Sequence, residues 1–240
     1  CNEISFSPTH TIKHKSFFSF KTLTKEQLNL LVFNIGMIEL ISYWKATCSK
    51  IVIIKPYKIN DKQILFWKKL YFNGLGEFFY LNDIHTTIDD FMDIVCKSNE
   101  ELSPTHFELK EEYLVPIGGG KDSVVSLELL RGKGKDITPL IISPRGATLD
   151  CVRLANFDRN EIVETSRTID KNLLALNDKG YLNGHTPFSA MLAFTSLLLS
   201  AMTRKRYIAL SNESSANEST VKGENINHQY SKSLEFEDDF

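Results

Sequence analysis

The residues best suited to chemistry form one glycine-rich segment in the middle of the chain: Gly118, Gly119, Gly120, Lys121, Asp122 and Ser123. Glycines carry no Cβ atom, so backbone N–H groups in such a turn can approach a ligand closely. Lys121 adds a full positive charge, and Asp122 and Ser123 can hold a magnesium ion or a phosphate oxygen. The segment therefore predicts a phosphate-binding loop.

The sequence on either side of this glycine loop predicts the elements that position it. The apolar run Tyr113–Pro116 is typical of a buried strand, and Val124–Leu130 of a helix. The positive N-terminal end of that helix points at the loop, which favours an anion. An ordinary glycine-rich turn without a ligand is the alternative, but the charged residues beside the glycines favour a nucleotide.

The spacing separates this loop from the Walker A type. Val115 stands where the first Walker A glycine belongs, and Asp122 follows the lysine. The loop instead resembles the S-G-G-x-D-S signature of the PP-loop ATP pyrophosphatases, with Gly118 in place of the first serine. That resemblance implies ATP and Mg²⁺ as cofactors, cleavage between the α- and β-phosphates, and transfer of AMP to a substrate oxygen.

Composition narrows the class of protein. The 240 residues are 42% hydrophobic and 24% charged, as in a soluble globular protein. A net charge of −2 gives no support to a nucleic-acid or membrane partner. The four cysteines are scattered and form no C-x-x-C pair, so we expect reduced thiols and a cytoplasmic location. The missing initiator methionine and the abrupt C-terminal end lead us to expect a fragment of a longer chain.

We expect two regions, divided by the polar stretch Ser98–Glu112. Residues 1–105 form a smaller α+β region, with a capped helix from Lys25 to about Lys45, a buried strand Ile51–Ile54 and a helix from Asp61 to about Tyr71. Residues 106–240 form the ATP-binding α/β domain, truncated at its C-terminus.

The second region shows a β-α-β pattern. The strands Tyr113–Ile117 and Thr138–Ser143 flank a helix over Asp122–Arg131, which requires a right-handed crossover and a parallel sheet. A helix capped by Thr186, with Pro187 at its first position, runs to about residue 203, and a buried strand follows over Tyr207–Leu210. The fold class is therefore α/β with an open parallel sheet, and the glycine loop lies where such sheets bind ligands.

Further polar segments should reach the same rim of the sheet. Arg145 could neutralise a phosphate or a carboxylate, although a solvated surface arginine is equally consistent. Glu213 could help Asp122 to hold magnesium. In the C-terminal segment, His228 and Lys232 are candidate acid–base groups. His185 fits a structural role better.

Five segments together resemble a narrower family; they are Val115–Ser123, Ser143–Thr148, Gly184–Pro187, Leu210–Ala216 and Asn227–Ser233. They are similar to the MurL family, whose members are UDP-N-acetylmuramoyl-L-alanyl-L-glutamate epimerases of bacterial peptidoglycan synthesis. The resemblance covers about residues 105–240, and the preceding region is assigned to the family by position alone. It implies a PP-loop (adenine nucleotide alpha-hydrolase-like) sheet, a UDP-N-acetylmuramoyl dipeptide substrate and a longer full chain.

Adenylation explains why an epimerase would need ATP. A glutamate Cα–H becomes more acidic once its neighbouring carboxylate is converted to a neutral acyl-adenylate, because the enolate then carries less negative charge. On this hypothesis His228 is the base, Lys232 stabilises phosphate or enolate charge, and Arg145 assists. The alternatives are another adenylating PP-loop enzyme, such as an amide ligase or a tRNA-modifying enzyme, and a nucleotide-binding module without turnover. The sequence gives no oligomeric state.

Overall fold

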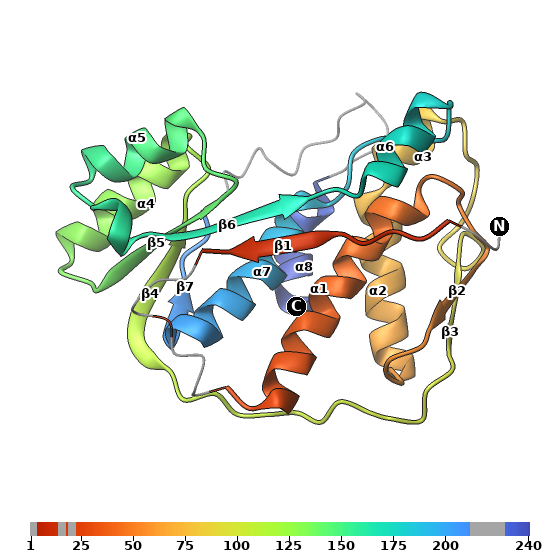
Figure 1. Cartoon of the computed structure of the whole chain (residues 1–240), viewed down its shortest axis with the longest axis horizontal. Coiled ribbons are helices and arrows are strands. Elements are labelled where there is room, and N and C mark those ends of the chain that lie inside the picture. The colour runs from red at the N-terminus through yellow and green to blue at the C-terminus, as the bar shows by residue number, and fades with distance from the viewer. Residues whose placement is uncertain (1–3, 14–17, 19–22, 212–228) are drawn as a thin grey trace.

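A five-stranded sheet organises the chain (Figure 1), and the computed structural model describes residues 4–13, 18, 23–211 and 229–240. The sheet has the strand order β1-β6-β5-β4-β7. Its members are β1 (Thr9–Ile12), β4 (Lys110–Pro116), β5 (Ile137–Ile142), β6 (Val163–Thr168) and β7 (Lys205–Ile208). Neighbouring strands from β6 to β7 are parallel, whereas β1 runs antiparallel along β6. The predicted α/β class is confirmed as a mostly parallel sheet.

The order of the strands creates a reversal at β4. Helix α4 (Lys121–Gly132) connects β4 to β5, and α5 (Gly146–Leu154) connects β5 to β6, so the chain first moves in one direction across the sheet. It then returns to add β7 on the other side of β4. The carboxyl end of β4 is therefore a topological switch point, the place where open α/β sheets bind ligands.

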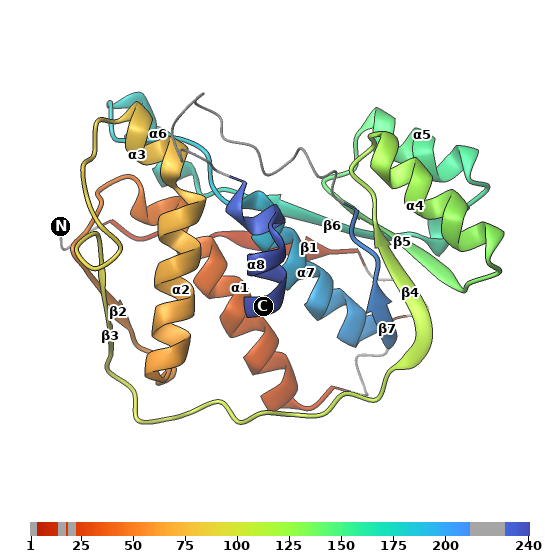
Figure 2. The same ribbon diagram turned by 180° about the vertical axis from the view of Figure 1, so that it is seen from behind.

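Helices cover both faces of the sheet. Successive residues of β4 point to opposite faces, so Val115 joins the core under α4 and α5, and Leu114 joins the core on the other side. On that other side α7 (Phe188–Thr203) packs against the strands and against α1 (Lys25–Trp44). The layers are visible from both directions (Figures 1 and 2).

The first helix begins where its cap predicts. The Gln27 N–H donates to Thr24 Oγ1 over 3.2 Å, and the Thr24 N–H donates to Gln27 Oε1 over 2.8 Å. The N-terminal region continues with β2 (Ile51–Ile54), α2 (Asp61–Gly74), α3 (Gly76–Leu81) and β3 (Asp93–Cys96). Strands β2 and β3 form a separate parallel pair.

The predicted burial of β2 is wrong. Ile51 is 58% exposed and Ile53 43% exposed, whereas Ile54 is buried. A β-branched run has the same appearance in a central strand and in a two-stranded ribbon, and this one lies in a ribbon with an open face. The strand itself is confirmed.

The N-terminal region shares its core with the sheet. Buried side chains of α1 and α2, such as Ile38 and Leu70, belong to the same hydrophobic cluster as Leu140 and Val163 of the sheet. The Tyr71 hydroxyl, also fully buried, donates to the carbonyl oxygen of Met37 over 2.5 Å. The predicted division near residue 105 stays a prediction.

The last predicted helix and strand are displaced by one or two residues. The predicted burial of this strand is wrong, since Tyr207 is 38% exposed and Leu210 44% exposed in an edge position of the sheet. Pro187 is the N-cap of α7, without a side-chain capping bond, and not its first helical residue. At the other end Arg204 adopts φ +58°, which turns the chain directly into β7. Lys205 and Arg206 therefore lie in a strand, where Arg206 pairs with Glu111 at 2.6 Å.

The remaining elements are short: η2 (Arg159–Glu161), α6 (Lys171–Asp178), η4 (Tyr230–Lys232) and α8 (Leu234–Asp239).

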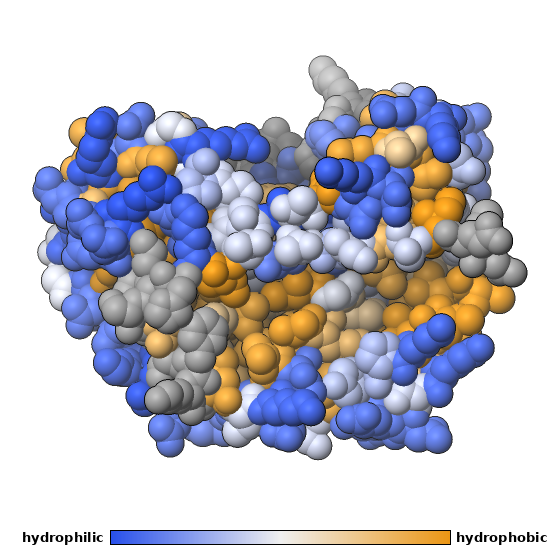
Figure 3. Space-filling model, in the orientation of Figure 1, coloured by the Kyte–Doolittle hydropathy of each residue, from blue (hydrophilic) through white to orange (hydrophobic). Residues whose placement is uncertain are grey.

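On one face of the molecule an apolar hollow of about 790 Å³ lies between β1, α1 and β2 (Figure 3). Within the described ranges, no helix is long and apolar enough to cross a membrane.

Candidate functional site

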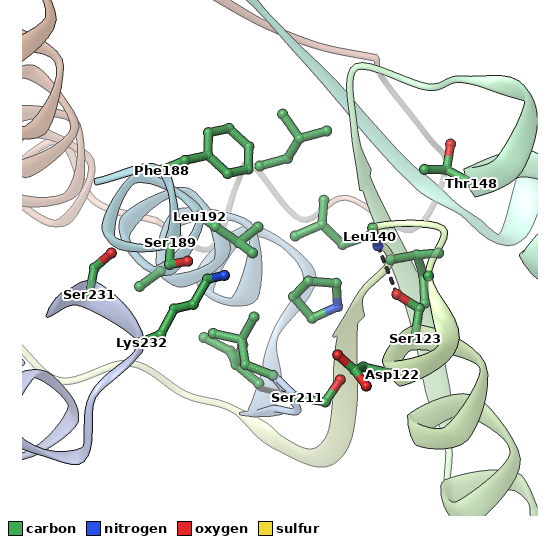
Figure 4. A pocket seen from close by; sticks show the side chains of 18 of the residues that line it. Asp122, Ser123, Leu140, Thr148, Phe188, Ser189, Leu192, Ser211, Ser231 and Lys232 are labelled. Carbon is green, nitrogen blue, oxygen red and sulfur yellow. Dashed lines mark hydrogen bonds between the residues drawn. The ribbon is translucent and has the colours of Figure 1, made fainter. Parts of the chain in front are cut away.

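A cavity of about 810 Å³ opens at the carboxyl ends of the parallel strands. Its walls come from the glycine loop after β4, the segments after β5, β6 and β7, the first turn of α7, and the η4–α8 segment (Figure 4). Pockets for small ligands commonly measure roughly 300–1,000 Å³. The cavity therefore has room for a nucleotide or a similar ligand at the switch point of the sheet.

A hydrogen bond within the glycine loop fixes its conformation, and the side of the loop at Gly120 is open. Gly118 N–H donates to Ser123 Oγ over 2.9 Å, and Ser123 is only 7% exposed. Gly120 is the N-cap of α4 without a side-chain capping bond, and a Cβ atom there would meet nothing within 4 Å. The α4 N-terminus, with no capping side chain and with open space beside it, suits an anion.

Gly119 is required by two constraints at once. Its φ of +85° lies in the region that side chains rarely adopt. A Cβ atom would also stand 3.1 Å from the Ala147 carbonyl carbon and from the Thr148 nitrogen. The glycine loop is thus packed directly against the start of α5.

The other predicted loop residues take different positions. The side chains of Asp122 and Ser123 line the cavity, and Asp122 makes no ion pair with any described residue (Figure 4). Lys121 occupies the first position of α4 but is not among the residues that line the cavity. Ser123 supports the loop with its oxygen, and its hydroxyl hydrogen remains available for a ligand.

The segment after β5 brings Arg145 to the same cavity. Thr148 fastens this turn, because its hydroxyl accepts from Arg145 N–H over 2.9 Å and donates to the Arg145 carbonyl over 2.8 Å. Ser143 adopts φ +53°, an uncommon conformation for a serine, and also lines the cavity. Within the described residues the Arg145 guanidinium makes no ion pair, so its charge can serve a ligand.

The opposite wall contains residues that the sequence did not indicate. Ser189 and Leu192 from α7 line the cavity, together with Phe188, which is 54% exposed. Lys232, which the sequence did predict, extends from η4 into the space between this wall and the glycine loop (Figure 4). The only sequence signal for the α7 wall was the proline that marks the helix start, because an apolar helix predicts core and not cavity lining.

Lys69 of α2 fastens the segment that carries Lys232. The Lys69 ammonium lies 2.5 Å from Asp239 Oδ2, 2.7 Å from Glu235 Oε1 and 6.0 Å from the centre of the Tyr230 ring. The hydrogen bonds that Lys69 donates to Asp239 and Glu235 raise the pKa of Lys69, and burial raises the pKa of Tyr230 to about 12. Lys69 therefore stays charged and Tyr230 stays protonated, which holds η4 and α8 against α2 (Figure 2).

A further cation of the cavity is already neutralised. Arg167 lines the cavity, but its Nε and Nη2 atoms bind the two carboxylate oxygens of Glu39 over 2.5 and 2.8 Å. His10 Nε2 lies 2.6 Å from the same carboxylate. Burial opposes ionisation of Glu39, but hydrogen bonds from His10 and Arg167 prevail and lower its pKa. We assign this network to joining β1, α1 and β6.

The structure brings together most, but not all, of the predicted site residues. Glu213 and His228 lie outside the described residues, so the predicted magnesium pair and the predicted base stay predictions. His185 lies outside the cavity wall, with Nδ1 3.5 Å from Glu77 Oε2. Among the described residues no group of three His, Cys, Asp or Glu side chains could hold a metal ion.

Comparisons with known proteins identify three similar epimerases. The chain is 29% identical over 207 residues to the UDP-N-acetyl-alpha-D-muramoyl-L-alanyl-L-glutamate epimerase of Micromonospora sp., covering 82% of this chain and 43% of that protein. It is 30% identical over 221 residues to the epimerase of the same name from Xanthomonas oryzae pv. oryzae, covering 91% of this chain and 47% of that protein. A third epimerase of this name, from Salinispora tropica, is 30% identical over 200 residues. The match covers 82% of this chain and 42% of that protein.

The chain spans less than half the length of these relatives. No solved structure matches it significantly. The family model of the MurL N-terminal domain matches residues 2–240, so the likeness extends over the N-terminal region, where the sequence motifs gave none. The chain belongs to the MurL N-terminal domain family.

Proposed function

We propose that this chain is the nucleotide-binding part of an ATP-dependent epimerase. The enzyme would convert the terminal L-glutamate of UDP-N-acetylmuramoyl-L-Ala-L-Glu to D-glutamate in the cytoplasm, during peptidoglycan precursor synthesis. Family membership and the printed names of the relatives support the substrate. The observation that carries the ATP dependence is the glycine loop at the switch point, beside a helix N-terminus without a capping side chain.

The cavity has room for a nucleoside triphosphate and one metal ion. Gly120 leaves open space at the α4 N-terminus, and Gly118 and Gly119 bring the backbone close to it. Asp122 offers one carboxylate, which suits Mg²⁺ because this ion commonly takes one or two carboxylates together with substrate phosphates. Arg145 would balance phosphate charge, and Glu213 would be a second metal ligand. The strand order is compatible with a PP-loop type of sheet.

The proposed reaction has three stages. The α-carboxylate of the terminal glutamate attacks the α-phosphorus of ATP, and pyrophosphate leaves, which gives a mixed anhydride without the carboxylate charge. A base, for which we propose His228, removes the Cα proton, and an acid returns a proton to the opposite face. Water then hydrolyses the anhydride to AMP and the D-glutamyl product. Lys232 contributes positive charge inside the cavity.

The decisive experiment uses the full-length protein with ATP, Mg²⁺ and UDP-N-acetylmuramoyl-L-Ala-L-Glu in deuterated water. We expect AMP and pyrophosphate to be released, D-glutamate to appear on hydrolysis of the product, and deuterium to enter Cα in step with inversion. Omitting ATP should stop inversion and exchange together. Inversion that continues without ATP, or ADP as the product, would overturn the proposal.

The same experiment separates the alternatives. An amide ligase or a tRNA-modifying enzyme would leave this substrate unchanged. A nucleotide-binding module without turnover would bind ATP but release no AMP with the dipeptide substrate.

A further inference from the structure

The cavity has two polar ends that face one another. One end is the glycine loop with Asp122 and Ser123, and the other is formed by Ser189, Ser231 and Lys232 (Figure 4). The apolar side chains of Leu140 and Leu192 lie between them. A ligand that fills the cavity therefore meets a polar group at each end and an apolar surface in the middle.

The second end carries a positive charge, on Lys232, that no described residue neutralises. The Lys232 ammonium makes no ion pair with any residue that the structure describes. Glu237 also lines the cavity, yet no ion pair joins it to Lys232 within the described residues. The Lys69 contacts hold η4 in place, so Lys232 projects from a fixed support.

Two hydroxyl groups accompany this charge. Ser231 is 6% exposed, and its hydroxyl makes no hydrogen bond with the described part of the chain. Because Ser231 lines the cavity, this hydroxyl can donate to a ligand oxygen. Ser189 lies in the first turn of α7, whose N-cap supplies no side-chain hydrogen bond. An ammonium group, two hydroxyls and a helix N-terminus together favour an anion.

We propose that Lys232, Ser231 and Ser189 bind the side-chain carboxylate of the terminal glutamate, an inference that rests on the proposed function. The glycine loop at the other end takes the nucleotide phosphates, next to which the α-carboxylate must react. The side-chain carboxylate keeps its charge during adenylation, and two methylene groups separate it from Cα. The apolar surface of Leu192 suits those methylenes. Lys232 is then a specificity residue for the substrate and does not stabilise phosphate or enolate charge.

The test compares two substrates of the full-length enzyme, one ending in L-Glu and one ending in L-Gln on the same UDP-N-acetylmuramoyl-L-Ala. In the second substrate an uncharged amide NH2 group replaces one oxygen of the side-chain carboxylate. We expect wild-type kcat/KM for AMP release to favour glutamate by about 10- to 100-fold, the range for losing one charge-assisted hydrogen bond. Lys232→Met should bring the ratio close to one by lowering the glutamate value, and Lys232→Arg should restore part of the preference.

Two further variants and one binding measurement complete the design. Ser231→Ala, which leaves the η4 charges unchanged, should lower the ratio several-fold. Lys133→Met, an exposed lysine outside the cavity, should leave it unchanged. The affinity for MgATP alone, measured by calorimetry, should be the same in wild type and Lys232→Met.

The outcomes distinguish this inference from the proposed function. An unchanged ratio in both Lys232→Met and Ser231→Ala would overturn the carboxylate site while ATP-dependent epimerisation stands. A loss of MgATP affinity in Lys232→Met would assign the lysine to the nucleotide instead. If the wild-type enzyme releases no AMP with either substrate, the proposed function fails, and the carboxylate site fails with it.

Discussion

The substitution Gly119→Ala tests the packing of the glycine loop against α5. Gly119 and Gly180 share nearly the same φ, +85° and +86°, but only Gly119 has atoms within 4 Å of the position where a Cβ would stand. Gly180→Ala therefore measures the conformational cost alone. A left-handed alanine costs about 1–2 kcal/mol, of which roughly 0.4–1 kcal/mol is regained because the unfolded chain loses freedom.

Gly119→Ala adds a steric cost to this conformational cost. The Cβ would lie 3.1 Å from two backbone atoms of the Ala147–Thr148 peptide, which can move only by shifting the start of α5. Inserting a methyl group into a packed site costs about 1–3 kcal/mol. We expect urea unfolding of the protein to show that Gly119→Ala is less stable than Gly180→Ala by about that amount.

Gly120→Ala supplies the opposite control for the same loop. Its Cβ would enter open space, so the loss of stability should stay below about 1 kcal/mol, the cost of a poorer N-cap. The open space is where we place the phosphates, so MgATP affinity should fall in Gly120→Ala although the fold persists. Equal stability losses in Gly119→Ala and Gly180→Ala would refute the close approach to α5. Unchanged MgATP affinity in Gly120→Ala would refute the position of the phosphates.

Two further predictions concern single carboxylates. Asp122→Asn should abolish AMP release without unfolding the protein. The control Asp150→Asn, on the exposed face of α5 beside Arg153, should still release AMP. Equal activity of the two variants would show that Asp122 is not part of the site. Hydrogen bonds and charge from Arg159, assisted by Lys13 and opposed by burial, lower the pKa of Glu164 from 4.5 to about 2. Because the folded pKa is depressed, this stabilisation is complete above pH 4.5 and is lost as the pH falls towards 2. Glu164→Gln should flatten the pH dependence of the unfolding midpoint over that interval, and an unchanged slope would contradict the assignment.

Local patterns predicted the part of the site that belongs to one continuous segment. Strand β4, the glycine loop and α4 follow one another, and each has its own signal: an apolar run, glycines without side chains, and helical spacing. The parallel neighbour β5 followed from the short helical connection. The strand, the glycine turn and the helix that follows it could therefore be predicted from the sequence alone.

Features that depend on contacts between distant segments could not be predicted from the sequence. Thr9 of β1 pairs with Thr168 of β6, and no local property of either segment indicates the other. The α7 wall of the cavity has the composition of a core helix, so Ser189 and Phe188 gave no signal of their own. The contacts of Lys69 with α8 join residues far apart in the chain, and a surface lysine at a helical position predicts only solvation.

Helix α7 belongs to the ligand cavity and to the hydrophobic core at once. Its first turn lines the cavity, its body packs against α1, and its last residues lead directly into β7. Any opening of the helical layer that displaces α7 must also dismantle one wall of the cavity. A bound ligand therefore resists that opening by its own binding free energy, about 2.7 kcal/mol when its concentration is a hundred times the dissociation constant. The amide protons of α1, which does not touch the cavity, should then exchange with solvent more slowly when the cavity is occupied.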